Sequence, residues 1–316
     1  MSKKKFSHQI LLSKKRKYIY PLLDQGLSAK DLNEGIKVLK SGRITMGKKT
    51  QNFENKFKKF LGSKYALMVN SGSSANLLAI FGLIEAGILK RGDKVIVPSL
   101  SWSTTVFPLS QAGLIPVFCD QSEVDYNINL DQVEEQAKRN DVKGLMLIHT
   151  YGLSVNMDRV LDICQKNNIT LIEDTCESMG ASWGSKYAGS FGIVSTFSTY
   201  FSHHICTLEG GIVLTNNENL EEIYRSMRSH GWARNYPENA EIFSIYKDHD
   251  PSFLFPNTGF NIRISEPQAK IGIEQLKILP SILEKRTIAG NEYLKRLKTI
   301  PELNTYSINN KAKCVF

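Results

Sequence analysis

The stretch YALMVNSGSSANLLAIFGLIEAGILKRGDKVIVP, residues 65–98, has the pattern that decides the fold. Residues 65–70 form a short apolar run, residues 74–89 have the length and composition of a helix, and Gly92-Asp93 marks a turn before a second apolar run at residues 94–98. Short apolar runs bounded by turn signals are typical of buried strands. We therefore expect a strand, a helix and a second strand in succession.

The same alternation continues along the chain. We expect further strands at residues 115–119, 144–149, 169–174, 194–197 and 212–215, and a helix at residues 131–139 with Asp131 as its N-cap. Strands separated by helices at this spacing predict the α/β class, as a three-layer α/β/α fold around a mostly parallel mixed sheet. Beyond residue 217 the pattern is helical, with a long helix expected from Pro280 to about residue 298.

We expect three segments in the domain organisation. Residues 1–40 form an N-terminal segment, residues 41–258 a large ligand-binding domain, and residues 259–316 the start of a smaller C-terminal α/β domain. Because Cys314-Val315-Phe316 resembles the beginning of a strand, we expect the small domain to be incomplete.

Composition is that of an ordinary globular protein, with 41% hydrophobic and 22% charged residues among 316. No apolar run approaches the roughly 20 residues that span a bilayer, and no signal peptide is evident, so we expect a cytoplasmic protein. The net charge is +9, and seven basic residues lie within the first 17 positions. These basic residues would either attract nucleic acid or form a solvated N-terminal segment. We favour the solvated segment and expect no nucleic-acid partner.

The five cysteines are odd in number and lack C-x-x-C spacing. They therefore predict reduced thiols packed in the core, with neither a disulfide framework nor a metal site.

Polar or aromatic residues follow several of the expected strands. Ligands of parallel sheets bind beyond the carboxyl ends of the strands, so these residues are candidates for a binding site. Gly72 and Ser73 open a helix whose N-terminus would hold a phosphate, or would merely be capped. Asp174 would keep a pyridinium nitrogen protonated, or would cap a helix. Trp102 would stack on a flat ligand, or would pack in the core.

The segment STYFSHHICTLEGG, residues 198–211, is the most specific of these strand ends. Its adjacent His203 and His204 could be interpreted as metal ligands. Adjacent side chains of an extended segment point in opposite directions, however, so one ion would not readily take both. A lone histidine is more often structural than catalytic.

Taken in order, these segments resemble the DegT/DnrJ/EryC1/StrS family of PLP-dependent sugar aminotransferases, from about residue 42 to 298. The resemblance rests on SGRITMG at 41–47, FE at 53–54, SGSSA at 71–75, GDKVIVP at 92–98, IED at 172–174, EGG at 209–211 and GFNIR at 259–263. It implies the fold type I architecture of PLP-dependent transferases.

By that resemblance several residues would bind pyridoxal phosphate (PLP). Gly72, Ser73 and Ser198 would hold its phosphate, Asp174 would pair with its pyridine nitrogen, and Trp102 would stack on its ring. Asn261 matches an asparagine that reaches the phosphate from the neighbouring subunit, which implies a homodimer with shared active sites. Glu177 stands where the family usually has Gln facing the ring hydroxyl, and its role is left open.

His203 stands where the family carries its Schiff-base lysine, six residues before Glu209. A branch of the family has histidine there: the 3-dehydratases of GDP- or CDP-linked 4-keto-6-deoxy sugars. Imidazole cannot form a stable imine but remains a good base near neutral pH. The resemblance thus implies non-covalent PLP, its amine form PMP as reagent, L-glutamate as amino donor, and His203 as the base for C3 dehydration of a nucleotide-linked 4-keto-6-deoxyhexose in deoxysugar or O-antigen biosynthesis.

One member of that branch holds an iron–sulfur cluster on four cysteines, which lie largely after the Glu-Gly-Gly turn. Because residues 209–313 contain no cysteine, we expect no such cluster. Two alternatives stay open: a sugar aminotransferase that tolerates histidine, and a non-catalytic relative that binds PLP or another ligand as a regulatory protein.

Overall fold

A seven-stranded sheet forms the centre of the computed structural model, which describes residues 26–236 and 241–315. Its order is β1-β9-β8-β5-β4-β2-β3, and every neighbouring pair is parallel except the two pairs that β9 makes. The mostly parallel mixed sheet that the sequence predicts is confirmed. The strands are β1 (Tyr65–Val69), β2 (Lys94–Pro98), β3 (Ile115–Cys119), β4 (Val142–Ile148), β5 (Thr170–Asp174), β8 (Val194–Ser198) and β9 (Gly211–Thr215).

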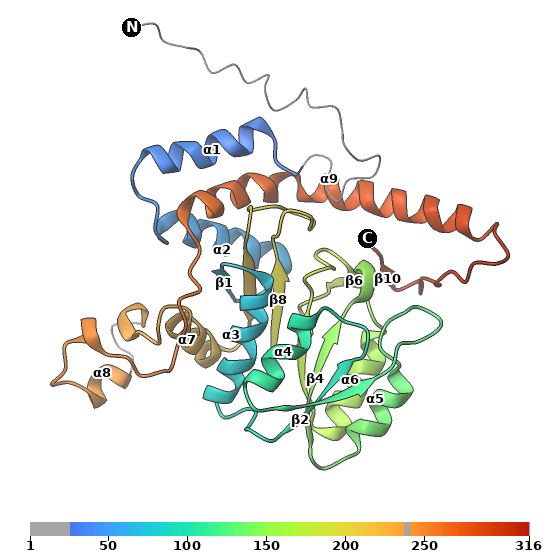
Figure 1. Cartoon of the computed structure of the whole chain (residues 1–316), viewed down its shortest axis with the longest axis horizontal. Helices are drawn as coiled ribbons and strands as arrows, with labels where there is room; N and C mark the ends of the chain where they lie inside the picture. The colour runs from blue at the N-terminus through green and yellow to red at the C-terminus, as the bar shows by residue number, and fades with distance from the viewer. Residues whose placement is uncertain (1–25, 237–240, 316) are drawn as a thin grey trace, which may run out of the picture.

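Helices cover both faces of the sheet (Figure 1). Alternate residues of a strand point to opposite faces. In β1, Leu67 and Val69 join the core under α3, whereas Ala66 and Met68 join the core under α2 and α9. The three-layer α/β/α fold is therefore confirmed. One layer holds α3 (Gly72–Glu85), α4 (Ser103–Gln111) and α7 (Glu218–Met227), and the other holds α2 (Lys48–Leu61), α5 (Leu130–Ala137), α6 (Met157–Asn167) and α9 (Glu266–Leu297).

Segments from both ends of the described chain pack together. Helix α9 contacts α1 (Ala29–Lys40) and α2, and Figure 1 shows it running across the top of the molecule. Near the C-terminus, β10 (Ala312–Lys313) pairs with β6 (Ser182–Trp183), which in turn pairs with β7 (Lys186–Tyr187). The division at residues 40 and 258 stays a prediction, and residues 1–25 of its first segment lie outside the described residues.

Three helix boundaries differ from the sequence-based predictions. The helix expected at residues 74–89 spans Gly72–Glu85. The N-cap of α5 is Asn129 rather than Asp131, because the Asn129 side chain accepts hydrogen bonds from the backbone N–H of Asp131 and Gln132. The long helix does not start at Pro280: α9 begins at Glu266 and continues through that proline.

Helix α2 was not among the predicted elements. It buries Phe53, Phe57 and Leu61, whose spacing of four residues places them on one helical face. That spacing was the signal from which α2 could have been predicted. The remaining short elements are α8 (Glu241–Ile245) and the 3-10 turns η2 (Thr150–Gly152), η3 (Ala233–Asn235) and η4 (Pro251–Phe253).

Within residues 26–236 and 241–315, no helix combines the length and apolar character that crossing a membrane requires.

Candidate active site

The carboxyl ends of β1, β5 and β8 meet at one edge of the sheet, beside the first turn of α3. Ser71 caps α3, and its hydroxyl accepts a hydrogen bond from the backbone N–H of Ser74 at 3.0 Å. In the described part of the chain, the backbone N–H groups of Gly72 and Ser73 have no acceptor. These two groups point outward from a helix N-terminus, where the helix dipole favours an anion.

The backbone packs closely around Gly72, Ser198 and Gly211 at this edge of the sheet, which we call the cradle. A Cβ added at Gly72 would lie 2.7 Å from the Cβ of Ser198 and 2.9 Å from the Sγ of Cys176. A Cβ added at Gly211 would lie 2.1 Å from the backbone oxygen of Ser71. Only glycine fits at either position, and Gly72 and Ser198 are brought together as the sequence predicts.

Asp174 ends β5 as a buried carboxylate with three donors. Its Oδ2 accepts hydrogen bonds from Asn76 Nδ2 and Thr105 Oγ1, each at 2.8 Å, and its Oδ1 accepts one from the backbone N–H of Cys176 at 3.1 Å. The amide oxygen of Asn76 accepts in turn from the Thr196 hydroxyl at 2.5 Å. The orientation of the carboxylate is therefore fixed from α3, α4 and β8.

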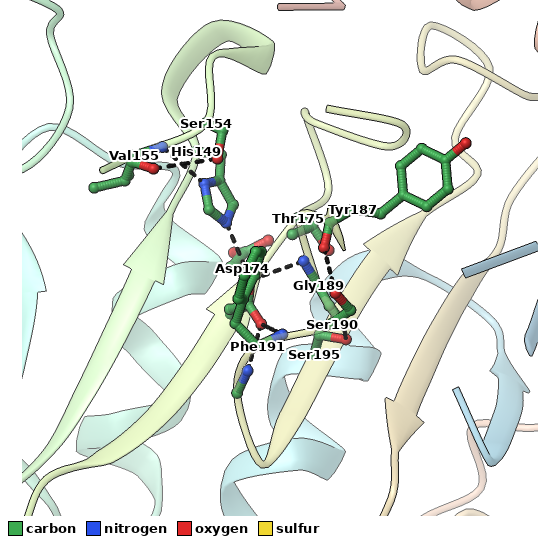
Figure 2. A network of polar contacts seen from close by, with 12 residues as sticks. His149, Ser154, Val155, Asp174, Thr175, Tyr187, Gly189, Ser190, Phe191 and Ser195 are labelled. Carbon is green, nitrogen blue, oxygen red and sulfur yellow. Dashed lines mark hydrogen bonds and ion pairs between the residues drawn. The ribbon is translucent and has the colours of Figure 1, made fainter. Parts of the chain in front are cut away.

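Glu173, the neighbouring carboxylate, points to the other face of the sheet and is fully buried. It accepts hydrogen bonds from the backbone N–H of Gly189, Phe191 and Gly192 at 2.7, 2.8 and 2.6 Å, and it lies 3.2 Å from His149 Nε2. Figure 2 shows this network, with His149 reaching toward the β5 end from beyond β4. Glu173 therefore holds the 189–192 loop, and only Asp174 faces the cradle.

His203 is half-buried and lies beside the turn that follows Asp174. Its imidazole lies close to the backbone of Cys176. Burial lowers the pKa of His203; the Cys176 backbone and the Asp174 charge oppose that shift, and the Arg286 charge adds to it. Burial therefore favours the neutral imidazole, which is the form that accepts a proton.

His204 points away from His203 to a separate partner. It is buried, its Nε2 lies 2.9 Å from the backbone oxygen of Val315, and its Nδ1 has no hydrogen-bond partner among the residues that the structure describes. Burial, and then the Arg286 charge, lower the pKa of His204 to about 3. Among the described residues, no group of three His, Cys, Asp or Glu side chains is arranged to hold a metal ion.

Trp102, Ser73 and Glu177 lie on the rim of the cradle. The Ser73 hydroxyl donates to Thr104 Oγ1 at 3.1 Å, which connects α3 to the first turn of α4. Trp102 occupies the N-cap position of α4 without a capping hydrogen bond from its side chain. It is 71% exposed, so the core-packing interpretation of this residue is wrong and its indole is accessible to a planar ligand. Glu177 is solvent-accessible, yet desolvation by the surrounding chain and then the Asp174 charge raise its pKa.

Within the described residues, Asn261 makes no hydrogen bond to the cradle of its own chain. It is exposed, its Oδ1 accepts from Arg263 Nε at 3.1 Å, and its backbone pairs with that of Ser229. The next residue, Ile262, accepts a hydrogen bond from the backbone N–H of Asn70 at 3.0 Å. Asn261 thus stays a predicted contact to a neighbouring subunit.

Three residues at this site were missed from the sequence: Asn76, Thr105 and Cys176. Each lies one to three residues beyond a position that the sequence did single out: Asn76 beyond residue 75, Cys176 beyond Asp174 and Thr105 beyond Trp102. These residues could have been predicted from the expected convergence of the strand ends. Polar side chains shortly after those ends lie near the shared edge of the sheet.

PLP fits these residues. The outward N–H groups and the glycine-only contacts at Gly72 suit a phosphate, and the fixed carboxylate of Asp174 suits a ring nitrogen. Together with the sheet topology, they define the class of PLP-dependent transferase folds. The chain belongs to the DegT/DnrJ/EryC1/StrS aminotransferase family, whose sequence pattern matches residues 26–315.

Similar proteins within that family are known. The chain is 43% identical over 272 residues to a GDP-4-keto-6-deoxy-D-mannose 3-dehydratase of Yersinia pseudotuberculosis, and the match covers 84% of this chain and 69% of the relative. A structure of the Escherichia coli GDP-4-keto-6-deoxy-D-mannose-3-dehydratase with bound hydrated PLP superposes with a TM-score of 0.88 at 38% identity, covering 94% of this chain and 77% of that one. A structure of the same kind of enzyme with a trapped PLP-glutamate geminal diamine also gives 0.88 at 38% identity, covering 93% and 77%.

Proposed function

We propose that this protein removes the C3 hydroxyl of a nucleotide-linked 4-keto-6-deoxyhexose, using PLP/PMP and L-glutamate. The observation that carries the proposal is His203, an imidazole beside the Asp174–Cys176 turn at the position of the family's lysine. The 43% identity to a GDP-4-keto-6-deoxy-D-mannose 3-dehydratase supports GDP as the nucleotide, and the PLP-glutamate adduct of a structural neighbour supports glutamate as amino donor.

The cradle would hold the cofactor without a covalent bond. The N–H groups of Gly72 and Ser73, with the Ser198 hydroxyl, would bind the phosphate, and Asp174 would pair with the ring nitrogen. Trp102 would cover one face of the ring, and Glu177 would face its hydroxyl. When bound, the cofactor supplies a protonated ring that withdraws electrons from the reacting carbon.

His203 acts as the base in this arrangement. Burial favours the neutral imidazole, which can accept a proton on its unprotonated ring nitrogen. General-base groups of this kind accelerate proton transfer by about 10²- to 10⁴-fold. Because imidazole cannot replace the substrate on the cofactor as a lysine does, the deoxygenated sugar leaves by hydrolysis, and net transamination of the sugar is disfavoured.

The overall reaction balances without an external oxidant. The sugar loses its C3 oxygen and is reduced by two electrons, and glutamate is oxidised by two electrons to 2-oxoglutarate. One ammonia is released for each deoxy sugar formed.

Product analysis tests this function. Purified protein is incubated with PLP, L-glutamate and GDP-4-keto-6-deoxymannose, with CDP- and dTDP-linked sugars in parallel, and the products are analysed by mass spectrometry. The expected product has lost one oxygen, with ammonia and 2-oxoglutarate in equal amounts. An amino sugar that retains its C3 oxygen would establish an aminotransferase instead, and bound PLP without turnover of any sugar would favour the non-catalytic alternative.

We also propose that the protein is a homodimer with shared active sites. Asn261 supports this proposal, because its side chain is exposed and hydrogen-bonds with Arg263, and the resemblance to the family implies that this asparagine enters the neighbouring subunit's site.

A further inference from the structure

The segment that carries His203 is a loop between β8 and β9 with a closed base. At this base the hydroxyl oxygens of Thr199 and Thr207 lie 2.6 Å apart, and the backbone N–H of Thr207 donates to the backbone oxygen of Thr199 at 2.9 Å. Both threonines are fully buried. Residues 200–206 therefore form one loop on a fixed base, beside the cradle at which β8 ends and β9 begins.

Gln275 of α9 holds one arm of the 200–206 loop. Its side chain is buried, with 2% exposed, and its Oε1 accepts a hydrogen bond from the backbone N–H of Cys206 at 3.1 Å. Cys206 follows His203 by three residues and immediately precedes Thr207 of the loop base. Because the base and Gln275 together fix the backbone on this side of the loop, they restrict where His203 can lie.

A carboxylate of α1 determines which way the Gln275 amide faces. The amide Nε2 donates to Asp31 Oδ2 at 3.0 Å, and Asp31 is buried. Since a carboxylate only accepts hydrogen bonds, the amide turns its NH2 group toward Asp31 and its oxygen toward Cys206. Asp31 Oδ2 also accepts from the backbone N–H and the hydroxyl of Ser28, at 2.8 and 2.7 Å. The capped start of α1 is thereby connected to the 200–206 loop through one amide of α9.

We propose that Gln275, oriented by Asp31, is a positioning residue for His203. The inference rests on the proposed function, in which His203 moves a proton beside the cradle. A general base must lie within hydrogen-bond reach of the atom that it deprotonates, and a misplacement of about 1 Å can cost about 100-fold in rate. A loop reaches that precision through contacts from rigid elements, and α9 supplies one at Cys206.

Hydrogen–deuterium exchange of the protein without cofactor tests this inference at the Cys206 amide itself. Gln275→Met keeps the length of the side chain and removes both of its hydrogen bonds. Exchange in peptides that cover residues 200–207 should become about 10- to 100-fold faster, because an unmade buried hydrogen bond has a cost of that size. Peptides of β4 and β5 should change less than the loop. Lys285→Met, at an exposed position of the same helix, is the control and should match wild type throughout.

An exchange of donor and acceptor provides a second test, which does not depend on Gln275→Met being folded. Gln275→Glu keeps an acceptor for Cys206 but places two carboxylates against each other, so the loop should again exchange faster. Asp31→Asn combined with Gln275→Glu should restore wild-type exchange, because the new amide at position 31 can donate to the new carboxylate at position 275. Unchanged loop exchange in both single variants of Gln275 would overturn the proposal, as would a double variant that exchanges as fast as Gln275→Glu alone.

Steady-state kinetics connects the loop to the reaction. Gln275→Met should lower kcat by about 10- to 100-fold and leave the KM for the sugar nucleotide nearly unchanged, because the geometry of proton transfer is disturbed and substrate binding is not. Faster loop exchange with an unchanged kcat would mean that Gln275 holds the loop without positioning His203, and would overturn the proposal. No deoxy sugar from wild type, with the double variant still restoring loop exchange, would contradict the proposed function alone.

Discussion

Asp174 shows how residues without a recognisable motif determine a catalytic geometry. The carboxylate itself is evident from the sequence, because it ends a buried strand. Two of its donors, Asn76 and Thr105, lie inside helices, where nothing in the local sequence separates them from other polar helix residues. Only the packing of α3 and α4 on the sheet brings them to Asp174.

Thr105→Val removes one donor to a buried carboxylate while keeping the shape of the side chain. Because a hydrogen bond to a charged group contributes about 1.5–3 kcal/mol, PLP binding should weaken by at least about tenfold. Equilibrium dialysis or quenching of protein fluorescence by PLP measures the dissociation constant. Ser110→Ala, at an exposed position of the same helix, is the control. Equal PLP affinity in Thr105→Val and wild type would mean that the Thr105 hydroxyl is not needed to position Asp174 for the cofactor.

His204 makes the folded state sensitive to acid. Its folded pKa of about 3 lies below the usual value of 6.5, so between these pH values the unfolded chain binds a proton that the folded protein does not. Stability from this group is fully present above pH 6.5 and falls as the pH is lowered toward 3, by at most about 1.4 kcal/mol per pH unit. Urea midpoints at pH 7, 6 and 5 should therefore fall more steeply for wild type than for His204→Gln.

The exposed His249→Gln is the matched control for that series and should keep the wild-type slope. If His204→Gln also keeps the wild-type slope, the claim that His204 is buried in its neutral form is wrong.

At the scale of elements, α2 depends on a carboxylate from the far end of the chain. Glu266, the first residue of α9, is buried and accepts hydrogen bonds from Gly47 N and Lys49 N at 2.8 Å each and from the Thr50 N and hydroxyl at 2.9 Å each. A negative charge there also complements the dipole of α2. Glu266, at the start of α9, thus accepts the hydrogen bonds of the free backbone N–H groups at the start of α2.

Glu266→Ala leaves those buried donors without an acceptor. We expect a loss of about 2–4 kcal/mol in the free energy of unfolding, measured by denaturant titration. Glu292→Ala, which removes an exposed pair with Arg296 on the same helix, should cost no more than about 0.5 kcal/mol. Similar losses in the two variants would refute the capping role of Glu266.

The elements that the sequence predicts well are those with local signals. The strand positions follow from apolar runs that the sheet buries. The start of α9 was misplaced because two prolines, Pro267 and Pro280, both fit a helix start. Ser265 and Gln268 form a capping box at the first, and the helix tolerates the second in its interior.

At the scale of the whole molecule, the sheet order brings the site together. Strands β1, β5 and β8 are far apart in sequence, and β9 lies between β1 and β8. The general rule for strand ends predicts that Gly72, Asp174 and Ser198 converge. It does not predict the path of α9 across the molecule, because that path depends on packing with α1 and α2 rather than on a local pattern.

Shared active sites can be tested by mixing two inactive variants. In a dimer of one His203→Asn chain and one Asn261→Ala chain, one site carries both changes and the other carries neither. With random exchange of subunits, half of the dimers are mixed, so the mixture should reach about a quarter of wild-type activity. Sedimentation of the same samples confirms the dimer. A mixture no more active than its components, despite demonstrated exchange, would place both residues in the same chain's site.

The central claim is that residue 203 faces the reactive carbon of PLP, and borohydride reduction tests it most directly. Wild type and His203→Lys are loaded with PLP, reduced, denatured and mapped by peptide mass spectrometry. Wild type should release its cofactor, with the aldehyde reduced to an alcohol and no pyridoxyl group left on the protein, whereas His203→Lys should carry a reduced pyridoxyl phosphate group on residue 203. A lysine-bound group in wild type, or PLP bound but never attached in His203→Lys, would contradict that claim.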